Sequence, residues 1–318
     1  MADTLLDRIR PNLVLFGALA ANLGIGIAKF IAAGITGSSS MLSEGFHSCV
    51  DSLNQVLLLY GQHRAKRPAD AAHPFGYGRE LYFWAFVVAL LIFALGAGIS
   101  VYEGVKHIEE PEPLTSPTVN YIVLAISFAL EGSSLTLALR EFRESQGGLG
   151  WWQAVRQSKD PSGFMVLFED SAAIAGLVIA ALGVWASHYF NHPELDGYAS
   201  VAIGGVLALV AVVLAREAKG LLIGERADPA IITEVYRLVD GHPAIASVNH
   251  VRTIHTAPNQ VFVAISADFH DTVTMGEGEH LIEALEQKLK AALPMLSSIY
   301  IRPERREEAT LVPPPRTG

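Results

Sequence analysis

LYFWAFVVALLIFALGAGISVY, residues 81–102, is a run of 22 positions without a charged side chain. A second run of this kind covers residues 197–215, which is 19 positions. A helix needs about 20 apolar residues to cross the hydrocarbon layer of a bilayer. The two runs therefore predict an integral membrane protein and exclude a simple soluble enzyme.

Charge is scarce in the chain and unevenly distributed. Asp, Glu, Lys and Arg make up 17% of the 318 residues, against about 25% in soluble domains. From Glu225 onward 22 of 94 residues are charged, which is close to the soluble frequency, whereas the first 224 residues hold the other 33. This shift predicts a transmembrane domain over residues 1–224 and a soluble domain over residues 225–305. The net charge of −9 argues against a nucleic-acid partner.

We predict six membrane-spanning helices, at about residues 12–33, 40–61, 81–102, 117–138, 164–189 and 197–222. The second span is the least apolar, because it contains Glu44, His47, Asp51, Asn54 and Gln55. Lys and Arg gather in the loops after the second and fourth spans. Since positively charged loops face the cytoplasm, both termini are expected to be cytoplasmic.

Beyond Gly224 the periodicity becomes that of a small soluble domain. Helical spacing predicts helices over residues 229–239 and 276–293, and the other apolar segments predict strands over residues 245–254, 261–269 and 298–302. The expected fold is an all-α bundle of six transmembrane helices followed by a small α+β (αββαβ, ferredoxin-like) cytoplasmic domain. A domain of about 80 residues is small, so pairing with a second copy is expected. Residues 306–318 include three consecutive prolines and are expected to be a disordered tail.

Titratable side chains inside the predicted spans are the candidate functional residues, because a charge at bilayer depth costs about 3 kcal/mol. His47 and Asp51 are four positions apart and Glu44 precedes His47 by three, so the three lie on one helical face. In the fifth span Glu169 and Asp170 are adjacent. One imidazole and several carboxylates form the donor set of a divalent-metal site. Mutual pairing of these groups is the alternative, and it leaves negative charge unbalanced.

Two segments resemble the cation diffusion facilitator family of metal transporters. Residues 36–55, TGSSSMLSEGFHSCVDSLNQ, contain the HxxxD pattern at His47 and Asp51. Residues 73–104, HPFGYGRELYFWAFVVALLIFALGAGISVYEG, are similar to the family's entry to the third helix. The resemblance implies a Y-shaped homodimer in a lipid bilayer that exports zinc or related divalent ions in exchange for protons, without a prosthetic group.

The fifth helix departs from the family pattern. The family usually has His or Asp four residues before its last Asp, whereas here Val166 precedes Asp170. The resemblance implies Glu169 as the substitute ligand, as in a branch of the family whose fifth helix reads Glu-Asp. The expected transport site is therefore His47, Asp51, Asp170 and Glu169, with Glu44 and Asn22 as further candidates. Such a set is harder than one with two histidines, which favours manganese or iron without excluding zinc.

Other positions give weaker candidates. In the loop after the second span, Asp70 and His73 match a second metal site of the family, but Tyr77 stands where that site has another His. Asn22 is either an auxiliary ligand or a helix–helix hydrogen-bonding residue. Lys29 and Glu131 are lone opposite charges in the first and fourth spans. Either they pair with each other, or Lys29 extends toward a membrane interface.

Two other functions stay open from the sequence: a divalent-cation channel, and a membrane metal sensor or scaffold without transport. Proton–metal antiport by alternating access is the expectation, because imidazole and carboxylates bind either a metal ion or protons. No nucleophile–base pair, phosphate-binding loop or cofactor motif is present in the sequence, so no enzymatic activity is expected. We expect the bacterial plasma membrane as the location, because the sequence shows no organelle transit peptide.

The soluble domain is predicted to dimerise without a dense metal cluster. Where the family has a ligand on the middle strand this chain has Ser266, and the family's terminal HxDP-like ending reads Tyr300, Ile301, Arg302 and Pro303. A metal analysis of the isolated fragment from Glu225 onward should find at most one bound ion per chain. More than one ion per chain would contradict this prediction.

Overall fold

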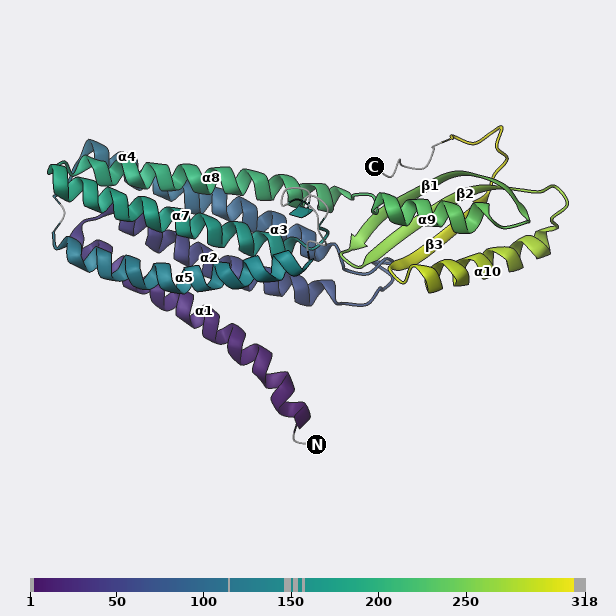
Figure 1. Cartoon of the computed structure of the whole chain (residues 1–318), viewed down its shortest axis with the longest axis horizontal. Coiled ribbons are helices and arrows are strands. Elements are labelled where there is room, and N and C mark those ends of the chain that lie inside the picture. The colour runs from purple at the N-terminus through teal and green to yellow at the C-terminus, as the bar shows by residue number, and fades with distance from the viewer. Residues whose placement is uncertain (1–2, 114, 146–149, 151–153, 156–157, 312–318) are drawn as a thin grey trace. The chain divides into compact units, whose positions relative to one another are not determined.

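The computed structural model describes the backbone of residues 3–113, 115–145, 150, 154–155 and 158–311, and the side chains of these ranges other than residues 3–18, 21 and 145 (Figure 1). It divides into two compact units. The helical unit comprises residues up to His63 together with Tyr82–Ala218. The C-terminal unit comprises Arg64–Leu81 and the residues from Lys219 onward.

Long helices that lie side by side form the helical unit (Figure 1). In chain order they are α1 (Asp3–Thr36), α2 (Ser39–Ala65), α3 (Glu80–Leu91), α4 (Gly98–Glu109), α5 (Pro117–Ser145), α7 (Pro161–Phe190) and α8 (Glu194–Ile223). A π-helical turn, Ile92–Ala97, joins α3 to α4, so the two form one continuous helical segment. An additional residue per turn of this kind often marks a functional position in a helix.

Within the described residues, four helical segments are long and apolar enough to cross a membrane. They are Glu80–Glu109, Pro117–Glu144, Pro161–Phe190 and Glu194–Ile223. They coincide with the third to sixth predicted spans, so a membrane helical domain is confirmed. The described side chains of α1 contribute a shorter apolar stretch, Asn22–Thr36, and α2 is too polar to meet the same criterion. The count of six spans stays a prediction.

The N-terminus of α2 is held by a buried carboxylate of α8. Asp196 accepts hydrogen bonds from the hydroxyls of Ser38 (3.0 Å), Ser39 (3.2 Å) and Ser40, and from the amide nitrogen of Ser40 (3.1 Å). The first N–H groups of a helix have no intrahelical acceptor and favour negative charge. Asp196 therefore fixes the start of α2 against α8. It thereby also fixes the position of the polar face of α2 along the helix bundle.

The C-terminal unit contains a three-stranded sheet and two helices. The elements follow the order α9 (Pro229–Asp240), β1 (Ile245–Ala257), β2 (Gln260–Phe269), α10 (Met275–Ala292) and β3 (Leu296–Pro303). The sheet has the order β1-β2-β3, with β1 antiparallel and β3 parallel to β2. This is the predicted sequence of elements, and the strands extend one to three residues beyond most of the predicted ends.

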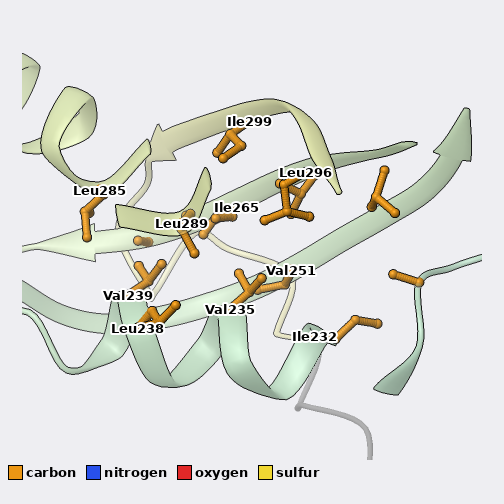
Figure 2. Packing of buried hydrophobic residues seen from close by; sticks show 14 of the residues in the cluster. Ile232, Val235, Leu238, Val239, Val251, Ile265, Leu285, Leu289, Leu296 and Ile299 are labelled. Atoms are coloured by element: carbon orange, nitrogen blue, oxygen red, sulfur yellow. The ribbon is translucent and has the colours of Figure 1, made fainter. Parts of the chain in front are cut away.

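The core of this unit lies between the helices and the sheet. Figure 2 shows Val235 and Val239 of α9 and Leu289 of α10 pointing toward the strands. The buried positions of α10 repeat every four residues, and those of β2 alternate, as amphipathic elements require. The alternating residues of β2 are Val261, Val263, Ile265 and Ala267.

The first residues of the predicted tail contact the sheet. The amide nitrogen of Arg306 donates to Asp268 Oδ2 at 3.2 Å, and the carbonyl oxygen of Thr310 lies 3.0 Å from His250 Nδ1. Arg306 and Thr310 therefore have hydrogen bonds to β2 and β1, which proline content alone did not indicate. The remainder of the predicted tail, residues 312–318, lies outside the described residues.

Replacing the core residue Leu285, which is 1% exposed, should destabilise the C-terminal domain. Leu285→Ala removes buried methyl groups and leaves a cavity, so the free energy of unfolding should fall by about 2–5 kcal/mol in urea unfolding of the C-terminal fragment. Met275→Ala, at a position that is 80% exposed, serves as the control and should stay within about 0.5 kcal/mol of the parent. Equal losses in both variants would contradict this description of the core.

Candidate metal centre

A cavity of about 210 Å³ lies inside the helical unit, lined by residues from α1, α2, α5 and α7. Four carboxylates line it: Asp51, Glu131, Glu169 and Asp170. Among its described lining residues none is Lys or Arg. Carboxylates are costly to bury without a positive partner, so this cavity is suited to a cation.

Helix α2 places His47 and Asp51 on one face, one turn apart. His47 is 2% exposed, and its Nδ1 lies 3.4 Å from Asp51 Oδ1. Within the described structure, both ring nitrogens of His47 and this oxygen of Asp51 are buried without a hydrogen-bond partner. Because an unpaired buried polar atom is unfavourable, these atoms mark a place for an additional group. Imidazole nitrogen and carboxylate oxygen are ligands that fit a divalent transition metal.

Helix α7 contributes the two adjacent carboxylates, each held by a different neighbouring helix. Glu169 Oε1 accepts a hydrogen bond from Asn54 Nδ2 of α2 at 3.1 Å. Asp170 Oδ2 accepts one from Ser134 Oγ of α5 at 2.8 Å. Hydrogen-bond partners of this kind orient metal-binding carboxylates. Both carboxylates line the cavity, and Val166, one turn before Asp170, lines it without a ligating atom.

Sequence reasoning did not assign a role to Asn54 or Ser134. Asn54 follows Asp51 by three positions and His47 by seven, so it lies on the same face of α2, and this spacing was a usable signal. Ser134 had no such signal. Its role depends on how α5 packs against α7, since the bond to Asp170 joins residues 36 positions apart.

The two weaker candidates of the membrane domain lie in different surroundings. Asn22 of α1 lines the cavity. Glu44 pairs with Lys29 instead, with 2.9 Å between Glu44 Oε2 and Lys29 Nζ. Lys29 also contacts Glu131 at 3.0 Å, which is the pairing that the sequence suggested.

The structure thus brings Asp51, Glu169 and Asp170 to one cavity and places His47 against Asp51. In the described part of the chain, no three His, Cys, Asp or Glu side chains are already positioned to bind one ion together. Binding at this centre would therefore require side chains to converge. The assignment of His47, Asp51, Glu169 and Asp170 as one site stays a prediction.

The loop candidate is occupied by its own hydrogen bonds. Asp70 Oδ2 accepts from the Tyr77 hydroxyl at 2.7 Å, and Asp70 Oδ1 accepts from the amide nitrogens of Ala72 (3.0 Å) and His73 (2.7 Å). The Tyr77 hydrogen bond holds the pKa of Asp70 below its ordinary value. Tyr77, where the family has a ligating His, therefore satisfies the carboxylate without a metal.

Ser266, which stands on β2 where the family has a metal ligand, is also hydrogen-bonded. Ser266 is 1% exposed, donates to Glu304 Oε2 at 2.6 Å and accepts from Asn249 Nδ2 at 3.1 Å. A buried hydroxyl with both a donor and an acceptor partner is a satisfied structural group. This arrangement agrees with the prediction of a domain without a dense metal cluster, which stays untested.

Two family models match most of the chain. The model described as the cation efflux transmembrane domain matches residues 15–223. The model described as the cytoplasmic domain of cation efflux proteins matches residues 227–306.

Individual relatives are similar over most of this chain. It is 34% identical over 265 residues to the proton-coupled zinc antiporter SLC30A9, mitochondrial, of Xenopus laevis, which is 83% of this chain and 47% of the relative. It is 29% identical over 255 residues to metal tolerance protein C4 of Arabidopsis thaliana, covering 80% and 56%. It is 24% identical over 269 residues to the cation-efflux pump FieF of Yersinia enterocolitica, covering 84% of each. The chain spans about half the length of the first two relatives.

The hydrogen bond between Tyr77 and Asp70 can be tested by titration. Tyr77→Phe removes the largest of the effects that lower the pKa of Asp70, so this pKa should rise toward its ordinary value. The loop arrangement, which is favoured above the ordinary pKa and lost as the pH falls through the lowered one, should then be lost at a higher pH.

Carboxyl-carbon NMR of the labelled Asp70 would follow this titration. His73→Ala is the matched control, because it keeps the backbone donor and should move the pKa less. An unchanged pKa in Tyr77→Phe would contradict the assignment.

Proposed function

Because the chain belongs to the cation efflux family, we propose that it exports a divalent metal cation in exchange for protons. The observation that carries the proposal is that Asp51 of α2 and Glu169 and Asp170 of α7 line one cavity of the membrane domain. The unpaired buried atoms of His47 and Asp51 adjoin it. This combination is expected of a site that binds its cation reversibly.

Family membership confirms two of the predictions from the sequence. The resemblance to metal transporters is confirmed by both family models, and cation efflux proteins are membrane transporters rather than enzymes. The Glu-Asp branch stays a prediction.

The transported ion is proposed to be zinc, manganese or iron(II), carried as substrate rather than as a cofactor. One imidazole with three carboxylates is a donor set of intermediate hardness, which zinc accepts and which also suits manganese and iron. The SLC30A9 relative is named as a zinc antiporter, which supports zinc as the first ion to test.

Proton coupling follows from the chemistry of the same ligands. Each must be deprotonated to bind a metal ion, so metal and protons compete for them. In the proposed cycle, the inward-open bundle binds the cation from the cytoplasm. Protons from the opposite side then displace it after the bundle has opened outward, a shift between two conformations that share one site.

The assembly and location are also proposals. The positive loops support cytoplasmic termini, as does the description of the matching family model as a cytoplasmic domain. The small size of the C-terminal domain supports a homodimer. The bacterial plasma membrane stays our prediction. Two of the relatives named above point to other locations: one carries the word mitochondrial in its name, and another is a plant protein.

A channel and a non-transporting sensor remain the alternatives that an experiment must separate. A channel would use the same carboxylates but would show flux that does not saturate. A sensor would bind the metal at equilibrium and move none.

Flux into proteoliposomes, with zinc, manganese and iron(II) offered separately under an imposed pH gradient, tests the function. Asp51→Ala and Asp170→Ala each remove a proposed ligand. Loss of a residue that only supports a metal ligand weakens a site by about 10–100-fold. Loss of the ligand itself should therefore lower saturable flux by more than this. Glu169→Ala should change the preference among metals. Glu286→Ala, at a partly exposed carboxylate of α10, is the control and should transport normally.

The outcomes separate the functions. Saturable flux that responds to the gradient and needs Asp51 supports antiport. Flux indifferent to the gradient would argue against proton coupling, and unchanged flux in Asp170→Ala would remove the site assignment.

A further inference from the structure

A buried ammonium group joins three helices beside the cation cavity. Lys29 of α1 is fully buried, and its Nζ lies 2.9 Å from Glu44 Oε2, 2.9 Å from Ser48 Oγ and 3.0 Å from Glu131 Oε1. An ammonium has three N–H donors, so these three contacts use all of them. The cluster contains two carboxylates for one positive charge, and one carboxylate is thus in excess.

The two carboxylates differ in their freedom to move. Glu44 is fully buried, and its Oε1 lies against Gly176 of α7 so closely that a Cβ at that position would collide with it. Glu131 has a side chain that is 15% exposed and lines the cavity. Glu44 is therefore the enclosed counter-ion of Lys29, whereas Glu131 lies between the ammonium and the cavity.

Glu131 also shares its helical face with a residue that already serves the centre. Ser134 follows it by three positions on α5, lines the same cavity and donates to Asp170. The carboxylate of Glu131 thus comes from the helix that orients Asp170, and it joins Asp51, Glu169 and Asp170 around one space of about 210 Å³.

We propose that Glu131 is an additional, exchangeable ligand of the transported cation, and that Lys29 is the tethered cation that holds it when no metal is bound. The inference rests on the proposed function. A divalent ion entering the cavity competes with Lys29 for the Glu131 carboxylate, because it carries two charges and faces four carboxylates. When the ion leaves, Lys29 and Glu131 pair again. Lys29 acts as a positioning residue that favours release.

Two variants of the full-length chain test this exchange. Glu131→Gln keeps the shape of the side chain and can still accept from Lys29, but it is a weaker metal ligand. Lys29→Met combined with Glu44→Gln removes the ammonium together with its enclosed counter-ion, so that Glu44 is not left as a fully buried, unpaired charge. Ser133→Ala, an exposed neighbour on α5, is the matched control.

Metal affinity is measured for zinc and for manganese in the purified protein by competition with a fluorescent metal indicator, and flux is measured in proteoliposomes. Glu131→Gln should weaken binding about 10–100-fold, the range seen when a group that supports a metal site is lost. The double variant frees Glu131 and should bind the metal more tightly while turning over more slowly. Ser133→Ala should match the parent in both measurements.

Affinities within twofold of the parent in both Glu131→Gln and the double variant would overturn the inference and leave the cluster a structural ion pair. Asp51→Ala and Asp170→Ala in the same assay distinguish failure of the Glu131 exchange from failure of the proposed function. If they weaken binding while Glu131→Gln does not, the exchange is wrong and the proposed function stands. If neither weakens binding, the proposed function itself is wrong.

Discussion

The arrangement of the site depends on the contacts of one buried ammonium group, that of Lys29 in the membrane domain. A charge in this setting is tolerated only with partners, and Lys29 takes them from α2 and α5. The three helices are therefore held together by contacts that apolar packing alone would not direct. Because Glu44 and Ser48 flank His47 on α2, the same contacts determine which way the polar face of that helix points.

Hydrogen bonds to α8 and α7 also hold the polar face of α2. Asp196 of α8 binds the serines at the start of the helix, and Asn54 near its middle binds Glu169 of α7. Between these points His47 and Asp51 keep buried atoms without hydrogen-bond partners in the described structure. A helix held by hydrogen bonds on both sides of His47 and Asp51 thus presents unpaired atoms between them, which suits a site that takes up an additional group.

Two positions show how loss of a ligand is accommodated. In the loop, Tyr77 donates to Asp70, and in the C-terminal domain Ser266 bonds with Glu304 and Asn249. In both places the family pattern has a metal ligand and this chain has a hydroxyl. The carboxylates of Asp70 and Glu304 accept these hydrogen bonds, so local structure persists without an ion. Sequence comparison could identify the missing ligand. The bonds of Ser266 join β2 to residues 17 and 38 positions away, so they could be seen only in the folded domain.

The sequence by itself determined the apolar membrane segments, the order of helices and strands after Gly224, and the shared face of His47 and Asp51. These depend on the charge and periodicity of neighbouring residues, which are local properties. Only the tertiary structure decided how the intramembrane charges divide. Lys29 pairs with Glu44 and Glu131, and Glu131 also lines the cavity together with Asp51, Glu169 and Asp170. The two partners of Lys29 are 15 and 102 positions away from it in the sequence. Which carboxylate meets the ammonium is therefore set by how the helices pack, and no local pattern carries that information.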